Sequence, residues 1–415
     1  MATHEYRRNH YVPEWYQKRF LVPGKGDKKF FYLDMKPDTV TAPNGHRYKR
    51  NDLLRWGADL CFMETDLYTT KFGSFESTEI EEKFFGDIDV RGKSAVEYFA
   101  QFEHPDVEPD AFNDLMVYMS TQKLRTPKGL AYLSKKTKSR NKNALLFGLQ
   151  SLQNMFCALW TECVWQLADC KTTNTKLILS DHPVTVYNKG CFPLSTLANL
   201  LGDPEVWYNG THTYFPLSEE RVLILTNLSW VRHPYGNPMR VRPNPNLFRG
   251  AMFNFTGIQT HRELSELEVT QINYITKSRA RRYIAARQKE WLYPEAKLAS
   301  RVWSKFGDDY LLMPDPRSVT YSTEIVIGYE DGSGESMDEY GRRPWQKGYS
   351  GEAKNRADWE TFHAFQGEYA RLFGPKRRGR SFEIGRLSNA EDTADFHEYH
   401  LKLEAKFNKR RFKAR

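Results

Sequence analysis

The fold of the chain is decided near its N-terminus by the stretch Asn9-His10-Tyr11-Val12-Pro13-Glu14-Trp15-Tyr16-Gln17-Lys18-Arg19-Phe20. An N-terminal segment usually frays in water, but this one carries too many rings and apolar groups to remain solvated. Pro13 disfavours the α region for Val12, so residues 9–12 are predicted to be extended. Pro13 also suits the first turn of a helix, and the aromatic residues that follow recur at helical spacing. The stretch therefore predicts an extended segment that can aim Asn9 and His10 into a cleft, followed by roughly two helical turns.

Length and composition indicate a packed protein of more than one domain. The chain has 415 residues, which exceeds what one hydrophobic core normally supports. No apolar run reaches the roughly eighteen residues of a membrane span, and the polar segment 1–10 does not resemble a secretory signal. The five cysteines form no CxxC pair, which favours reduced thiols. We therefore expect a cytoplasmic protein that does not associate with membranes.

Changes in hydrophobic period along the chain predict a mixed α+β fold. Helices are predicted over residues 78–102, 109–124, 143–170, 266–289, 356–373 and 388–411, and strands over residues 29–34, 176–180, 184–187, 213–217, 222–226 and 319–329. Thr78 and Ser265 each stand three positions before a Glu, which is the capping-box pattern of a helix start. The apolar stripe of helix 109–124 is expected to pack against helix 143–170 and comprises Phe112, Leu115, Met116 and Met119.

Composition and charge divide the chain near residue 295. Residues 1–295 are predicted to form the α+β core domain, and residues 296–415 a basic, α-rich C-terminal appendage. The net charge is +9, and the thirteen Lys/Arg and six Asp/Glu of residues 371–415 contribute most of it. Such an asymmetry suggests a polyanionic partner, although a solvated helical tail would look the same. Nucleic acid is the expected partner, with Arg377, Arg378 and Arg380 as candidate substrate-binding residues.

Several motifs in order resemble one known family. The motifs are the opening Asn-His-Tyr-Val-Pro, Gln122-x-x-Arg125-Thr126-Pro127, Ser180-Asp181-His182-Pro183, Pro216-Leu217-Ser218 and Ile272-Asn273. Together, over about residues 4–290, they resemble the bacterial and fungal family catalogued as domain of unknown function 4238. His182 stands where that family usually has Asn, and Asp89 where it more often has Glu. The family has no assigned activity, so the resemblance implies an architecture and a set of candidate residues.

The candidate catalytic residues are His10, Arg125 and Asp181. His10 could act as a general base or metal ligand, because its pKa ordinarily lies near neutrality, or it could anchor the N-terminus. Asp181 follows a buried strand, a usual position for a functional carboxylate, but it could also cap its own turn before Pro183. Arg125 could hold a phosphate with two hydrogen bonds or pair with a buried carboxylate such as Glu81 or Asp181.

The remaining candidates complete a possible phosphodiesterase site. Asn9 and Gln122 are candidate substrate-binding residues, and Asp181 and Glu81 are candidate ligands of Mg²⁺ or Mn²⁺. His182 is either a loop residue or a further ligand. Carboxylates that hold a metal, a His that activates water and an Arg that holds phosphate are the set used in metal-assisted phosphodiester cleavage. We therefore predict that His10, Arg125 and Asp181 line one cleft, together with a carboxylate from residues 79–89.

The absence of four catalytic or nucleotide-binding motifs disfavours several classes of enzyme. The chain lacks the phosphate loop GxxxxGK[ST], GxGxxG, GxSxG and HExxH, which disfavours NTPases, dinucleotide enzymes, α/β-hydrolases and zincins. The first expectation is a cytoplasmic hydrolase, specifically a metal-dependent nuclease with a defence- or toxin-like role. The alternative is a non-catalytic protein that binds nucleic acid or another protein through its basic tail.

Overall fold

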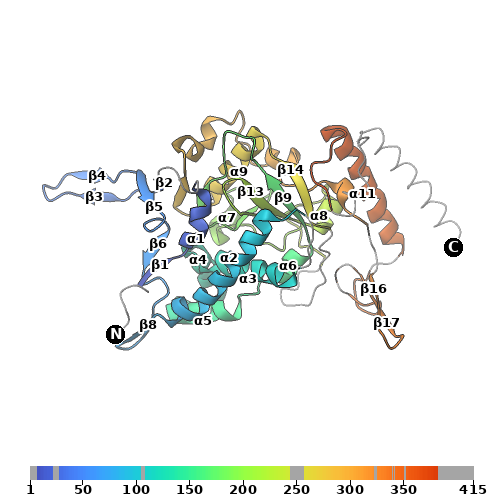
Figure 1. The fold of residues 1–415 in the computed structure, drawn as a ribbon, viewed down its shortest axis with the longest axis horizontal. Helices are drawn as coiled ribbons and strands as arrows, with labels where there is room; N and C mark the ends of the chain where they lie inside the picture. The colour runs from blue at the N-terminus through green and yellow to red at the C-terminus, as the bar shows by residue number, and fades with distance from the viewer. Residues whose placement is uncertain are drawn as a thin grey trace.

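A computed structural model of the chain describes residues 7–21, 28–103, 108–243, 257–321, 325–338, 340, 342–349 and 352–381. The fold is mixed α+β, as predicted (Figure 1). The α-helices are α1 Glu14–Gln17, α2 Gly86–Gln101, α3 Pro109–Arg125, α4 Pro127–Thr137, α5 Lys142–Ser151, α6 Cys157–Thr161, α7 Thr196–Leu201, α8 Leu228–Arg232, α9 Glu266–Arg279, α10 Lys305–Asp308 and α11 Glu352–Phe373. Within the described ranges, no helix has both the length and the apolar composition of a membrane span.

The strands and the remaining helical turns connect these helices. The strands are β1 Arg8–His10, β2 Lys29–Asp34, β3 Thr39–Thr41, β4 Arg47–Lys49, β5 Leu53–Gly57, β6 Met63–Thr65, β7 Thr70–Phe72, β8 Phe75–Ser77, β9 Cys163–Asp169, β10 Leu179–Ser180, β11 Thr185–Tyr187, β12 His212–Pro216, β13 Arg221–Asn227, β14 Gln259–Glu263, β15 Tyr283–Ala286, β16 Ile325–Gly328 and β17 Gly334–Met337. A π-helix, η3 Ile80–Phe85, precedes α2, and short 3₁₀ turns are η2 Lys18–Phe20, η5 Lys289–Leu292, η6 Pro294–Ala296 and η7 Pro316–Ser318.

A five-stranded sheet in the order β11-β12-β13-β9-β14 forms the centre of the molecule. Its pairs are antiparallel except β14, which runs parallel to β9. Helix α3 covers one face, where the ring of Phe112 lies 4.8 Å from that of Trp165 on β9. Helix α9 covers the other face, where the Tyr214 hydroxyl lies 2.9 Å from Thr276 Oγ1. Because both faces are covered, β9 and β13 are buried at nearly every position.

A second sheet, in the order β10-β15-β2-β5, connects the N-terminal part of the chain to the core. The hairpin β3–β4, which links β2 to β5, projects away from the body of the protein (Figure 1). The N-terminal stretch folds as predicted, with β1 followed by α1 and η2. Tyr16 fixes it to the central sheet, because its ring stacks on Phe215 at 5.1 Å and its hydroxyl donates to Pro216 O at 2.5 Å.

Three predicted helices differ from the structure. The helix predicted over residues 143–170 is wrong, because the chain forms α5, α6 and then the central strand β9. The helix predicted over residues 266–289 has the predicted capping box at Ser265 but ends at Arg279, and its remainder contains β15. The helix predicted from Thr78 begins as the π-helix η3, whose N-cap is Glu79 without a side-chain cap. The predicted helix over 388–411 lies outside the described residues.

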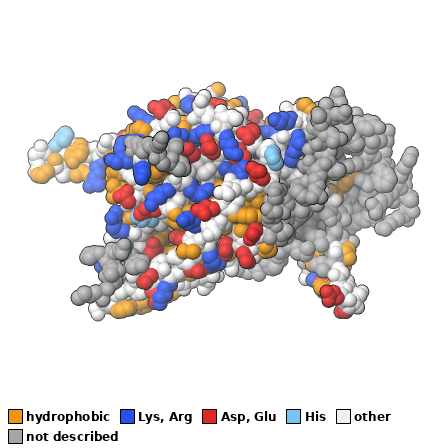
Figure 2. All heavy atoms as spheres, viewed as in Figure 1, with side chains coloured by type: hydrophobic (Ala, Val, Ile, Leu, Met, Phe, Trp, Pro, Cys, Tyr) orange, Lys and Arg blue, Asp and Glu red, His pale blue; other side chains and the backbone are white. Residues whose placement is uncertain are grey.

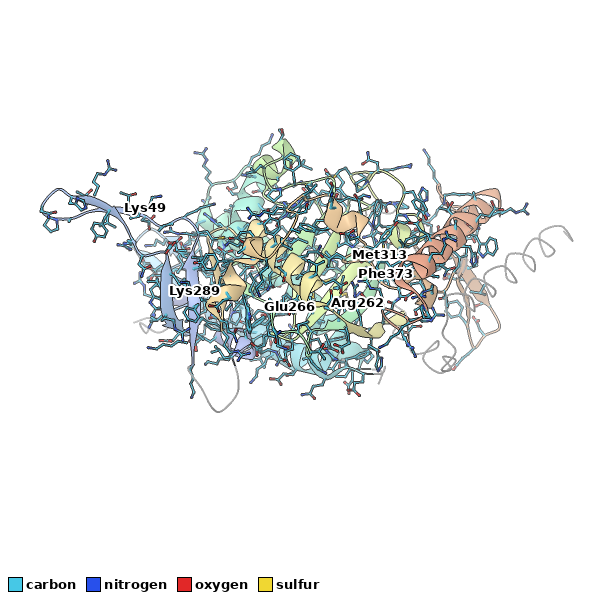
Figure 3. The ribbon with its side chains drawn as sticks, turned by 90° about the horizontal axis from the view of Figure 1, so that it is seen from above. Lys49, Arg262, Glu266, Lys289, Met313 and Phe373 are labelled. Atoms are coloured by element: carbon cyan, nitrogen blue, oxygen red, sulfur yellow. The ribbon has the colours of Figure 1, made fainter. Side chains whose placement is uncertain are left out.

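The described part of the predicted C-terminal appendage packs onto the core. Arg262 on β14 donates to the carbonyl oxygens of Leu311 and Met313, the latter at 3.0 Å (Figure 3). Trp303 and Leu311 belong to the same hydrophobic cluster as the N-terminal Tyr16. Residues beyond the predicted boundary at 295 therefore complete the interior of the residues before it.

Replacing Met116 by Ala is expected to cost roughly 2–5 kcal/mol of unfolding free energy, because it leaves a cavity. The predicted stripe is buried, with Met116 5% exposed. Chemical denaturation measures this cost, and Val90→Ala on α2 is the control, because Val90 is 70% exposed. A cost below about 0.5 kcal/mol for Met116→Ala would contradict the observed packing.

Candidate functional site

The C-terminal end of α3 directs polar side chains into two separate clusters. Gln122 and Arg125 enter the first, which we call the arginine cluster and which comprises Asn9, Tyr68, Glu81, Asp89, Gln122 and Arg125. Lys123 and the following Thr126 enter the second, which we call the histidine cavity and whose polar residues are Lys123, Thr126, Lys128, His182 and Asp203.

Arg125 is the centre of the arginine cluster. Its guanidinium donates to both carboxylate oxygens of Asp89, at 3.1 and 2.7 Å, and its Nε donates to Gln122 Oε1 at 2.7 Å. Gln122 Nε2 in turn donates to Tyr11 O at 2.7 Å, which ties the N-terminal stretch to α3. Arg125 is 1% exposed. The carboxylate partner of Arg125 is therefore Asp89, whose side chain is 24% exposed, rather than Glu81 or Asp181.

Glu81 is the unusual carboxyl group of this cluster. It lies on the π-helix η3, a rare element that often marks functional sites, and it shares a hydrogen bond with the buried Asn9. Its Oε2 is buried without a hydrogen-bond partner among the described residues. Burial raises the pKa of Glu81 to about 7; the nearby Arg125 opposes this effect and Asp89 adds to it. Glu81 can therefore gain or lose a proton near neutral pH.

Replacing Glu81 by Gln is expected to stabilise the protein at pH 8 but not at pH 4. Because the folded-state pKa of Glu81, about 7, lies above its ordinary 4.5, ionisation costs stability as pH rises between those values. The variant cannot ionise and should gain up to about 3 kcal/mol above pH 7. Thermal unfolding at both pH values measures the gain. Glu79→Gln, which removes an exposed carboxylate, should change either value by less than about 0.5 kcal/mol, and an equal gain in both variants would contradict the assignment.

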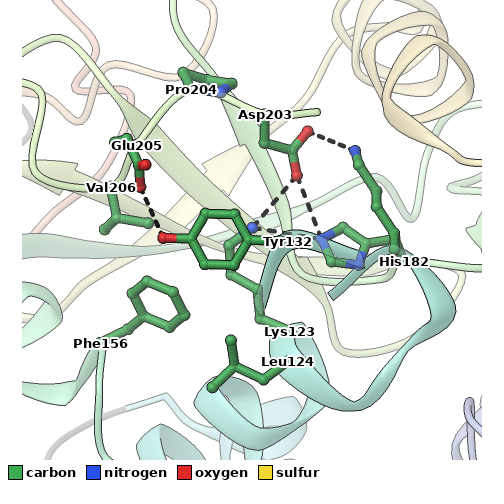
Figure 4. A pocket seen from close by; sticks show the side chains of 10 residues that line it. Lys123, Leu124, Tyr132, Phe156, His182, Asp203, Pro204, Glu205 and Val206 are labelled. Atoms are coloured by element: carbon green, nitrogen blue, oxygen red, sulfur yellow. Dashed lines mark hydrogen bonds and ion pairs between the residues drawn. The ribbon is translucent and has the colours of Figure 1, made fainter. Parts of the chain in front are cut away.

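The histidine cavity brings cationic and acidic groups together from three parts of the chain (Figure 4). His182 Nδ1 lies 2.7 Å from Thr126 Oγ1, and its Nε2 lies 3.4 Å from both Asp203 Oδ2 and Lys123 Nζ. Asp203 also pairs with Lys128 at 2.5 Å and with Lys123 at 3.6 Å. The carboxylate of Asp203 therefore contacts two ammonium groups and one imidazole.

Burial and these charges set the protonation states in the cavity. Burial and the adjacent Lys123 lower the pKa of His182 to about 3, so the imidazole is neutral at pH 7. Burial lowers the pKa of Lys123 to about 8, although Asp203 opposes the effect. Burial disfavours ionisation of Asp203, but Lys128 and Lys123 outweigh it and hold the pKa of Asp203 well below its usual range.

The cavity is small. Its volume is about 20 Å³, which is room for roughly one water molecule. The wall opposite α3 consists of residues 203–206, and Glu205 accepts a hydrogen bond from the Tyr132 hydroxyl at 3.0 Å. A larger ligand can therefore enter only if residues that line the cavity move.

The three predicted catalytic residues contact three different sets of partners. His10 Nε2 lies 3.1 Å from Asp59 O and 3.8 Å from Glu14. Asp181 is buried and accepts three backbone N–H bonds, at 2.7 to 2.9 Å, from Arg281, Arg282 and Tyr283. Asn9 and His10 are neighbours on β1, so their side chains point to opposite faces of the strand. Asn9, Gln122, Arg125 and Glu81 do come together, but His10 and Asp181 make no contact with them.

The predicted metal ligands are also separated. Glu81 bonds Asn9, whereas Asp181 holds the connection between α9 and β15. Within the described ranges, no three His, Cys, Asp or Glu side chains gather as metal ligands. A requirement for Mg²⁺ or Mn²⁺ stays a prediction.

The three arginines predicted to bind substrate lie where the described chain ends. The side chain of Arg378 pairs with Glu268 and lies 4.0 Å above the Phe373 ring. The backbone of Arg380 pairs with Thr260 on β14 at 2.9 Å in both directions. Arg377 is partly exposed. Arg378 therefore attaches this segment to the core, and the remaining Lys and Arg residues of the tail, after 381, lie outside the described chain.

The sequence contained one signal for the histidine cavity. Lys123 lies seven residues after Met116, so it continues the buried stripe of α3. A lysine in such a stripe requires a buried partner. Asp203 supplies it from an irregular segment after α7, where no periodicity marked it in advance.

A comparison with known protein families assigns part of the chain. Residues 140–290 match the family model described as "Protein of unknown function (DUF4238)". The match confirms over this segment the resemblance inferred from the motifs, and it contains Asp181, His182 and Asp203 but not the opening motif. No curated protein and no solved structure matches the chain.

Proposed function

We propose that the chain is a phosphodiester hydrolase of the nuclease type, with the histidine cavity as the site of the substrate phosphate. The observation that supports this proposal is the sharing of Asp203 by two buried ammonium groups, Lys123 and Lys128, beside a neutral imidazole. Fixed cations are what a transferring phosphoryl group requires, and Lys123 and Lys128 supply two of them beside Asp203.

The cavity residues can supply each part of a hydrolysis. A phosphate that displaces Asp203 from Lys123 and Lys128 would receive hydrogen bonds from both ammonium groups. His182 is neutral at pH 7, and its pKa of about 3 makes it a weak base in the empty cavity. The negative charge of a bound phosphate would raise that pKa and so allow the imidazole to accept the proton of the attacking water. The water oxygen forms the new P–O bond, the bond to the leaving oxygen breaks, and the departing alcohol takes up the proton that the imidazolium of His182 returns. Asp203 can stabilise the imidazolium formed at His182, as the acidic member of a triad does.

Binding without catalysis is the second candidate, and the small volume of the cavity favours it. Lys123 and Lys128 already pair with Asp203, and the volume of about 20 Å³ does not admit a phosphodiester unless lining residues move. A protein that uses this cluster only to hold α3 and α4 to the segment at Asp203 would bind nucleic acid elsewhere and turn nothing over.

One comparison separates the two candidates. Purified protein is incubated with labelled RNA and DNA in the presence of Mg²⁺, Mn²⁺ or chelator. The proposal expects cleavage that His182→Gln and Lys123→Met reduce at least about 100-fold, while Lys83→Met, which alters an exposed lysine, has no effect. Chelator-sensitive cleavage would support the predicted metal. Binding without cleavage, or cleavage that survives both cavity substitutions in folded protein, would overturn the proposal.

A further inference from the structure

The projecting hairpin β3–β4 takes no part in the proposed site. Figure 1 shows it extending from the β2–β5 ribbon, and Figure 3 places Lys49 on it, away from the body. Residues 43–52 are all exposed. The tip is a tight turn in which Gly45 has φ +81° and its N–H donates to Ala42 O at 2.9 Å.

The two faces of the hairpin differ in chemistry. Thr39 pairs with Lys49 and Thr41 with Arg47, so two cations and two hydroxyl groups share one face. Val40 pairs with Tyr48, which is 49% exposed, on the other face. Cations and hydroxyls repeated along an extended ribbon match the requirements for binding a phosphate backbone.

No acidic residue within the hairpin neutralises its basic side chains. Residues 39–50 contain no Asp or Glu, and the face drawn in Figure 2 has no acidic side chain on the projection. The nearest acidic residue before it, Asp38, is paired with Arg282 at 2.8 Å. Among the described residues, neither Arg47 nor Lys49 has an ion-pair partner. Arg47 and Lys49 are therefore available to an external anion, whereas Arg50 is near Asp38 and contributes to the lowered pKa of that carboxyl group.

The hairpin is also weakly supported by the rest of the protein. An isolated two-stranded hairpin is marginally stable in water, and this one gains no hydrophobic burial, because Val40 is its most covered strand residue and is still partly exposed. At its base the connection to the body includes the hydrogen bond from Arg50 N to Asp38 O at 3.0 Å. A two-stranded ribbon fits the roughly 12 Å major groove of a duplex, which would order it on binding.

We propose that the hairpin β3–β4 is an arm that binds double-stranded nucleic acid, with Arg47, Lys49 and Arg50 bound to its phosphates. The class of partner rests on the proposed function, but the arm is tested by binding alone. The arm would hold the duplex while the chemistry takes place on the body of the protein.

The test compares two triple variants with the same change in net charge. Arg47→Gln/Lys49→Gln/Arg50→Gln is expected to weaken binding of a labelled duplex about tenfold or more at 0.1 M salt. It should also reduce the slope of log affinity against log salt concentration by about 0.9 for each phosphate that the variant no longer neutralises. The control, Lys135→Gln/Lys138→Gln/Arg140→Gln on and after α4, should stay within about twofold of the unmodified protein, because those residues are exposed but lie off the arm.

Each outcome decides the inference. Equal reductions in affinity in both variants would show that only net charge matters, and an unchanged slope in the arm variant would show that the arm touches no phosphate; either result overturns it. Preferential binding of single strands that Tyr48→Ala abolishes would move the interaction to the opposite face and overturn it as well, as would binding to anionic vesicles without binding to duplex. Arm-dependent binding without cleavage would uphold the arm and count only against the proposed hydrolase.

Discussion

Replacing Asp203 by Asn is expected to lower the free energy of unfolding by roughly 3–5 kcal/mol at pH 7. The substitution keeps the size of the side chain but leaves Lys123, which is 8% exposed, and Lys128 as buried cations without their carboxylate. An uncompensated buried charge costs more than the intact pair contributes, because the hydration it lost on folding is no longer offset. Chemical denaturation at pH 7 measures the loss, with Asp87→Asn as the exposed control.

The loss should shrink as pH approaches 10. Without Asp203 the folded-state pKa values of Lys123 and Lys128 fall further below their ordinary 10.5. The unfolded state then binds more protons than the folded state, so the stability of the variant rises with pH through this window. Lys123→Met in the Asp203→Asn background should restore part of the stability by removing one unpaired cation. A loss that is independent of pH and unrelieved by Lys123→Met would contradict the electrostatic account.

Replacing Arg125 by Met is expected to lower the free energy of unfolding by roughly 3–5 kcal/mol at pH 7, as Asp203→Asn does. The change removes both hydrogen bonds to Asp89 and the bond that orients Gln122, whose amide donates to the carbonyl of Tyr11. The control is Arg91→Met, because Arg91 pairs with Asp87 and is 45% exposed. Exposed pairs contribute at most about 1 kcal/mol.

Thermal and chemical unfolding of both arginine variants distinguish a positioning role from a substrate-binding role. A structural Arg125 predicts a large stability loss in Arg125→Met and little loss in Arg91→Met. If Arg125→Met unfolds like the unmodified protein but loses nucleic-acid affinity, then Asp89 is not its principal partner in solution. Such a result would support the alternative that Arg125 binds phosphate.

The elements that the sequence predicted well are those with local signals. Pro13 and the rings after it specified β1 followed by α1, and the Ser265 capping box specified the start of α9. Helix α3 followed from the spacing of Phe112, Leu115, Met116 and Met119, all of which are buried. In each case the residues that determine the structure lie within a few positions of one another.

The central strand β9 could not be predicted by the same reasoning. A strand covered on both faces does not alternate apolar and polar residues, and residues 163–169 therefore continued the apolar pattern of the helices before them. What makes this segment a strand is its pairing with β13 and β14, which lie well beyond it in the sequence. Strand β13 pairs with one edge of β9, and β14 pairs with the other edge in parallel.

The partners within the arginine cluster and the histidine cavity could not be predicted from the sequence for a related reason. The carboxylate of Asp89 reaches Arg125 from 36 positions away, and Asp203 reaches Lys128 from 75 positions away. His10 and Asp181 lie in motifs, but motif membership does not specify the direction of a side chain. On β1, Asn9 faces the arginine cluster and His10 faces Asp59.

The pairing of β2 with β15 has a consequence for synthesis on the ribosome. Arg282, at the start of β15, bonds Asp34 at the end of β2, and the two lie 248 positions apart. At about 5–20 residues per second, β2 waits on the order of 10–50 seconds for this partner after it has been translated. During that time β5 can cover one of its edges, while the other edge presents unpaired N–H and C=O groups. A nascent chain that stalls before Tyr283 is therefore a half-built sheet with a row of open hydrogen-bonding groups, available to chaperones or to another stalled copy.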